Sequence, residues 1–143
     1  MKKDEVPQDQ AILGPWQELF YAVDEDGRYV LAPSRGWEAA TVANLQAWEV
    51  IAEEMEQALS AVRAGRASPL AFHMARCQMN PRLLSRYVGI GWWRVRRHLR
   101  PAGYAAMGSD LRERYARIFG IEAAELDRLP EQVQLPVPRV DEL

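Results

Sequence analysis

Apolar side chains recur every three or four residues through the middle of the chain, in the stretch that Gly65 closes. The stripe comprises Leu45, Trp48, Ala52, Met55, Leu59 and Val62. This spacing gathers them on one face of an α-helix, and the glutamates between them leave the other faces acidic. The pattern predicts one long amphipathic helix over residues 38–64.

The same stripe fits two arrangements of this helix. In one, the helix packs along the rest of the chain, as amphipathic helices of globular proteins do. In the other, it pairs with a second copy, because spacings of three and four alternate as in a heptad repeat. The side chains of that dimerisation seam are Leu45, Trp48, Met55, Leu59 and Val62. About two and a half heptads do not decide between the two arrangements.

Two short apolar runs around an acidic turn precede the helix. Residues 19–23 and 28–31 are rich in aromatic and aliphatic side chains, and the acidic turn Asp24–Gly27 separates them. An Asp-Gly turn between such runs is typical of a β-hairpin, which needs a packing partner to be stable. We therefore expect residues 16–66 to form a hairpin and a long helix that serve dimerisation or docking. The polar residues 1–15 are expected to form a mobile leader.

In residues 67–130, residues that cap a helix or end one recur at short intervals. Proline twice follows a capping residue, and glycine ends two helical patterns. These signals predict five short helices, which are Leu70–Gln78, Arg82–Val88, Trp92–Arg100, Asp110–Phe119 and Glu122–Leu129. Pro101 and Gly103 are expected to break the third helix. The predicted fold class is mainly α, a five-helix domain preceded by a β-hairpin and a long amphipathic helix. An extended tail over residues 131–143 follows.

Charge is distributed very unevenly along the chain, although the net charge is only −2. Residues 1–56 carry 12 acidic and 4 basic residues, and residues 110–143 carry 8 acidic and 5 basic residues. Between them, residues 57–109 contain nine arginines and no aspartate or glutamate. Such a segment favours a polyanion or an acidic protein partner.

Several classes of protein are disfavoured by the sequence. There is no apolar run of about 18 residues, so no membrane span is expected. The N-terminus is polar, unlike a secretory signal, and Cys77 is the only cysteine, which fits a cytoplasmic protein. No phosphate-binding glycine loop or catalytic triad spacing is present, so we expect neither an enzyme nor a cofactor. His73 and His98 lack a set of companion ligands, so no metal is expected.

The segment Asn80–Leu99 resembles the helix-turn-helix of the phage-repressor family, also called Cro-like or XRE. Ser85 is small enough for two helices to cross closely, and Gly89 supplies the positive φ of a tight turn. The apolar positions that join the two helices in this family are matched by Leu84, Val88, Ile90 and Val95. The resemblance covers residues 68–130, and the stretch from Leu111 to Leu126 is similar to the family's last two helices.

This resemblance implies a bacterial-type transcriptional regulator that binds double-stranded DNA as a homodimer. In the family the third helix lies in the major groove, and a dimer places two such helices about 34 Å apart. The residues at base-reading positions are Gly91, Trp92, Trp93, Arg96 and Arg97. The candidates for phosphate contacts are Arg82, Arg86, Arg94 and Arg100.

Two departures from the family pattern keep a second hypothesis open. Trp92 and Trp93 replace polar residues at the start of the reading helix, and His98 stands at a position that is usually apolar. The tryptophans fit packing residues, a protein interaction surface or DNA contacts. The arginines fit a solvated face, or ion pairs with the acidic long helix. The alternative function is a protein-interaction module that keeps a repressor-like fold and does not read DNA.

Overall fold

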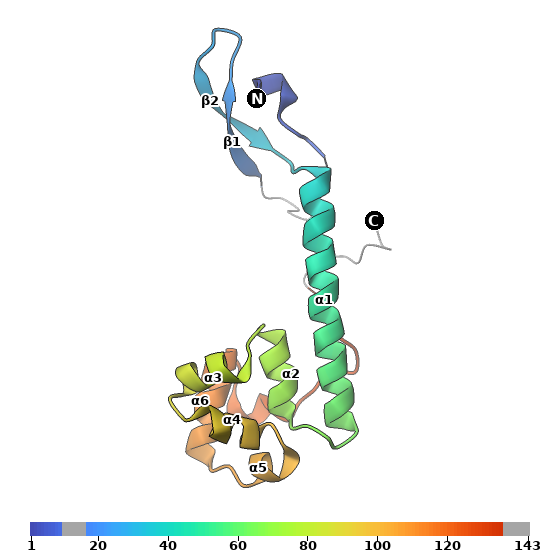
Figure 1. Ribbon diagram of the computed structural model, residues 1–143, viewed down its shortest axis with the longest axis vertical. Coiled ribbons are helices and arrows are strands. Elements are labelled where there is room, and N and C mark those ends of the chain that lie inside the picture. Colours follow the sequence, from blue (N-terminus) through green and yellow to red (C-terminus); the bar gives the residue numbers. More distant parts are fainter. Residues whose placement is uncertain (10–16, 136–143) are drawn as a thin grey trace. The chain divides into compact units, whose positions relative to one another are not determined.

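A computed structural model describes residues 1–9 and 17–135 of the chain (Figure 1). The described chain forms two compact units, residues 1–49 and residues 50–134. The long helix α1 (Glu38–Arg63) begins in the first unit and ends in the second. Most of the remaining regular structure is helical, and it is accompanied by one small antiparallel hairpin.

The first unit contains the hairpin, in which β1 (Glu18–Val23) pairs with β2 (Tyr29–Ser34). The connecting turn is held by Asp24, whose Oδ1 accepts hydrogen bonds from the backbone N–H groups of Asp26 and Arg28 at 3.0 and 2.8 Å. Such side-chain bonds to the backbone are the reason that aspartate favours turns. The hairpin predicted from the two apolar runs and the Asp-Gly turn is therefore confirmed.

Residues 1–9 pack on the hairpin instead of forming part of a mobile leader. They include the short 3-10 helix η1 (Lys3–Glu5), and the side chain of Val6 is buried. Two isolated parallel bridges hold the segment, Lys2 with Val23 and Gln8 with Gly36. The prediction of a mobile leader thus does not hold for residues 1–9, and residues 10–15 lie outside the described chain.

Helix α1 is confirmed within one residue of its predicted end. The apolar stripe is largely buried within the single chain: Leu45, Met55 and Leu59 are buried, and Trp48 and Val62 are partly buried. A dimer seam would need these side chains to be available to a second copy. The observed burial favours the arrangement in which the helix packs against its own chain.

The second unit is built from short helices around one core. These are α2 (Pro69–Arg76), α3 (Pro81–Val88), α4 (Trp92–His98), α5 (Pro101–Ala105), α6 (Ser109–Phe119) and the 3-10 helix η2 (Ala123–Glu125). Leu70, Leu84, Val95, Tyr115 and Leu126 are fully buried at its centre. The first four helices predicted for residues 67–130 are found, with ends that differ by a few residues.

Two details of the predicted helices are wrong. Pro101 does not simply break a helix; it begins the additional helix α5, because proline suits the first helical turn. Gly103 lies inside α5, where a Cβ would be 2.0 Å from the carbonyl oxygen of Arg97. The predicted helix Glu122–Leu129 is reduced to η2, and the carbonyl oxygen of the buried Leu126 lies 3.0 Å from Nε2 of His73.

The chain after η2 is held in place as far as it is described. Arg63 donates hydrogen bonds from Nη2 to the carbonyl oxygens of Pro130 and Glu131 at 2.9 and 2.7 Å. Val133 is buried. The start of the predicted extended tail is thus anchored to the end of α1, and residues 136–143 lie outside the described chain.

Candidate nucleic-acid interface

Helices α3 and α4 form a helical corner, defined here as residues 80–100. At its start, the side chain of Asn80 accepts a hydrogen bond from the backbone N–H of Leu83 at 2.9 Å, which caps α3. At the turn, Gly89 has a φ of 74°, a left-handed conformation that glycine adopts without strain. Ser85 is buried, and its hydroxyl donates to the carbonyl oxygen of Arg82. The cap at Asn80 and the turn at Gly89 thus have the roles predicted for them.

Helix α4 is fixed at its far end to the beginning of α2. The hydroxyl of Ser68 donates to the carbonyl oxygen of His98 at 2.7 Å, and the Ser68 N–H donates to the carbonyl oxygen of Leu99 at 2.8 Å. Val95 is fully buried against the core. These contacts make α4 a well-supported element with one face turned to solvent.

His98, the residue that departs from the family pattern, is buried in α4. Its Nδ1 lies 3.0 Å from the hydroxyl oxygen of Tyr115, and the two rings meet edge to face. Burial lowers the pKa of His98, and the nearby Arg94 and Arg97 lower it further. Burial also raises the pKa of Tyr115, so its hydroxyl stays protonated. His98 is therefore neutral near pH 7 and serves as a polar core residue.

All six arginines of the helical corner have exposed side chains. They are Arg82, Arg86, Arg94, Arg96, Arg97 and Arg100. An ion pair joins Arg112 to Asp127 at 3.3 Å, and it lies outside the corner. No carboxylate of residues 1–9 or 17–135 neutralises the corner arginines, so their positive field extends into solvent.

Both tryptophans of the corner are also exposed, which the sequence left open. Trp92 is 46% exposed and Trp93 is 61% exposed. The guanidinium carbon of Arg96 lies 5.5 Å from the centre of the Trp92 ring, one helical turn away. The Trp93 ring lies beside Gly91, where a Cβ would be 2.6 Å from the indole nitrogen. Neither tryptophan is a core residue, so the packing interpretation does not hold.

A shallow hollow opens between the start of α3 and the exposed face of α4. It is lined by Asn80, Pro81, Arg82, Trp92 and Arg96. The structure thus brings one predicted phosphate contact, Arg82, together with two predicted reading residues. Sequence analysis did not select Tyr87, an exposed aromatic side chain of α3. The only feature of the sequence that could have pointed to Tyr87 as an interface residue is its position among the arginines.

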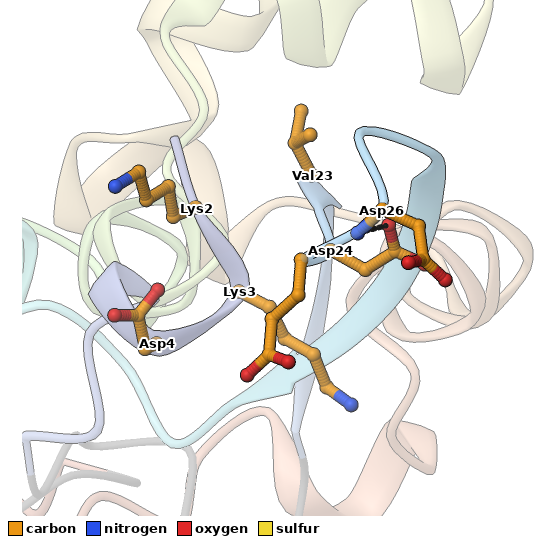
Figure 2. A pocket seen from close by; sticks show the side chains of 7 residues that line it. Lys2, Lys3, Asp4, Val23, Asp24 and Asp26 are labelled. Atoms are coloured by element: carbon orange, nitrogen blue, oxygen red, sulfur yellow. Dashed lines mark hydrogen bonds between the residues drawn. The ribbon is translucent and has the colours of Figure 1, made fainter.

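A larger hollow lies in the first unit, and its side chains do not form a patch of one charge (Figure 2). Lys2, Lys3 and Asp4 reach it from the N-terminal segment, and Asp24 and Asp26 come from the hairpin turn. The charges are mixed, and one Asp24 oxygen already accepts two backbone hydrogen bonds. Residues 1–9 and 17–135 hold no cluster of three or more side chains suited to a metal ion.

His73, the other histidine, is also a core residue. Its Nε2 lies 3.0 Å from the carbonyl oxygen of Leu126, and its ring stacks on Phe119. Its Nδ1 is buried without a hydrogen-bond partner. Burial lowers the pKa of His73, which keeps the ring neutral.

Comparison of the chain with models of protein families, with curated proteins and with solved structures gave no match. None of the helices in the described ranges is both long enough and apolar enough to cross a bilayer.

Proposed function

We propose that the protein is a sequence-specific DNA-binding transcriptional regulator whose helical corner is a repressor-like helix-turn-helix. One observation carries the proposal: the helical corner, whose two short helices meet at a glycine turn, carries six exposed arginines, and no described carboxylate pairs with them. Two helices joined in this way place the second helix in the major groove of duplex DNA. In this proposal α4 is the reading helix.

The exposed face of α4 has the chemistry needed to read base edges. Arginine matches the two acceptors of guanine, and we assign this role to Arg96 and Arg97. The ring of Trp92 restricts Arg96 through a cation–π contact, which lowers the entropy lost on binding. The apolar edge of Trp92 suits the methyl group of thymine.

The remaining arginines of the corner are assigned to the phosphate backbone. Arg82 lies in the first turn of α3, where its own backbone N–H and the helix dipole also favour an anion. The next N–H, that of Leu83, is already bonded to the side chain of Asn80. Arg86, Arg94 and Arg100 are exposed on the same corner. Such contacts set the position of a protein on DNA and carry most of the nonspecific affinity.

The test uses a duplex selected from a random-sequence library by the full-length protein, with a scrambled duplex as reference. We expect the wild type to bind the selected duplex about a thousandfold more tightly. The substitution pair Arg96→Ala and Arg97→Ala should reduce this discrimination at least about tenfold. The matched pair Arg117→Ala and Arg128→Ala removes the same charge outside the corner and should leave discrimination unchanged. Absence of any selected sequence, or equal loss in both pairs, would count against base reading.

The exposure of Trp92 and Trp93 favours a second candidate, a protein-interaction module with the same fold. Tryptophan and arginine are the residues most enriched at the energetic centres of protein interfaces. The two candidates separate in the experiment above, because an interaction module selects no duplex. Its wild type would also show no salt-dependent affinity for DNA.

A further inference from the structure

The hairpin of the first unit exposes an apolar face that no described segment covers. In the register of the sheet Tyr21 lies opposite Leu31, and Leu19 and Tyr29 lie on the same side because they are two residues away on their strands. These four residues define the outer hairpin face, and their exposed fractions range from 56% to 81%. Neighbouring cross-strand pairs make this face continuous.

The opposite face of the hairpin is buried, in contrast to the outer hairpin face. There Ala22 and Ala32 are almost fully buried, together with Val6 of the N-terminal segment. A two-stranded hairpin by itself has marginal stability, and packing on only one of its faces adds limited stability. A contiguous exposed apolar face on such an element marks an interaction surface.

We propose that the outer hairpin face is the interface of a homodimer, with a second copy of this chain as its occupant. The face carries no charged side chain, so two copies meet without burying like charges. The two tyrosines bury about 150–250 Å² each, and with the two leucines the face buries on the order of 600 Å² per copy. The total of about 1,200 Å² is the lower end of the range for specific interfaces and fits a reversible dimer.

This dimer supplies the partner that the proposed function expects, and it replaces the seam on α1 that the structure buries. It deepens that function, since a dimeric regulator reads two half-sites. The inference nevertheless stands on the hairpin alone, which lies in the other unit from the helical corner.

The experiment is sedimentation equilibrium of the full-length protein without DNA, from about 1 to about 100 µM. We expect a reversible monomer–dimer equilibrium in the wild type. The pair Tyr21→Glu and Leu31→Glu should raise the dimer dissociation constant at least about tenfold. The single change Tyr29→Glu, at the most exposed of the four positions, should act in the same direction. Tyr87→Glu on α3 is the matched control and should leave the equilibrium unchanged.

Folding of each variant is checked by circular dichroism and thermal unfolding, so that loss of the dimer is not loss of the fold. A wild type that stays monomeric over the whole range overturns the proposal, and so does a dimer that the outer-face changes leave intact.

The DNA proposal is tested separately, because Arg96→Ala with Arg97→Ala should dimerise like the wild type. Unchanged discrimination between duplexes by this variant, in a persisting dimer, counts against the proposed function alone.

Discussion

At the scale of single residues, the helical corner depends on one close approach and one left-handed turn. Gly103 of α5 lies against the backbone of α4, at the carbonyl of Arg97. Gly89 turns the chain with a positive φ, and a Cβ there would meet no atom within 4 Å. These two positions lie at the two ends of α4 and constrain its direction.

Gly103→Ala should destabilise the fold by about 1–3 kcal/mol, because the new Cβ would overlap a backbone carbonyl that has little freedom to move. Gly108→Ala is the control, since a Cβ there meets no atom within 4 Å. The measurement is urea unfolding of both variants. Equal stability of the two would show that α4 and α5 do not pack as closely as described.

The two buried histidines predict a loss of stability in mild acid. Burial lowers the pKa of both His73 and His98 below the ordinary value of 6.5. Below pH 6.5 the unfolded chain therefore binds protons that the folded chain does not bind. Their contribution to stability is complete above pH 6.5 and is lost as the pH falls through the folded-state pKa values.

The free energy of unfolding, measured between about pH 7.5 and about pH 5.5, should thus decrease with falling pH. His73→Phe and His98→Phe should each remove part of this dependence. A flat profile in the wild type would be inconsistent with neutral, buried histidines.

Other properties of single residues could not be predicted from the sequence. Helical spacing does not tell whether Trp92 or Trp93 faces the core, since both are large and largely apolar. The partner of His98 is Tyr115, which belongs to a different helix. Such contacts depend on tertiary packing, and local pattern carries no information about them.

At the scale of elements, helix ends follow local chemistry, and these were predictable. Asn80 followed by proline begins α3, and Gly89 ends it in the left-handed conformation. The errors occurred where tertiary contacts decide. The predicted last helix is shortened where Leu126 binds His73, and the extra helix α5 depends on contact with α4.

The cap of α3 can be tested directly. Asn80→Ala removes the acceptor for the Leu83 N–H and should lower the free energy of unfolding by about 1 kcal/mol. Asn80→Asp retains an acceptor at the same place and should restore most of this loss. If alanine and aspartate have the same effect in thermal unfolding, the cap contributes nothing to stability.

At the scale of the whole molecule, the arginines that cluster in the sequence also lie together on the surface of the second unit. The arginine-rich segment could be recognised from composition, and its helical corner from the pattern of caps and glycines. The burial of the α1 stripe and the attachment of residues 1–9 to the hairpin could not be established from the sequence, because both depend on contacts between residues that are distant in sequence. The predicted dimer seam on α1 had the right pattern, but its residues are occupied within one chain.

The most direct test of nucleic-acid binding is the salt dependence of affinity for a duplex of random sequence. Log affinity falls with log salt concentration at about −0.9 per phosphate neutralised. Four assigned phosphate contacts predict a slope of about −3 to −4, and Arg82→Ala with Arg94→Ala should flatten it by about 2. The pair Arg117→Ala and Arg128→Ala should leave the slope unchanged. A slope near zero, or one that the first pair does not change, would contradict DNA binding by the helical corner.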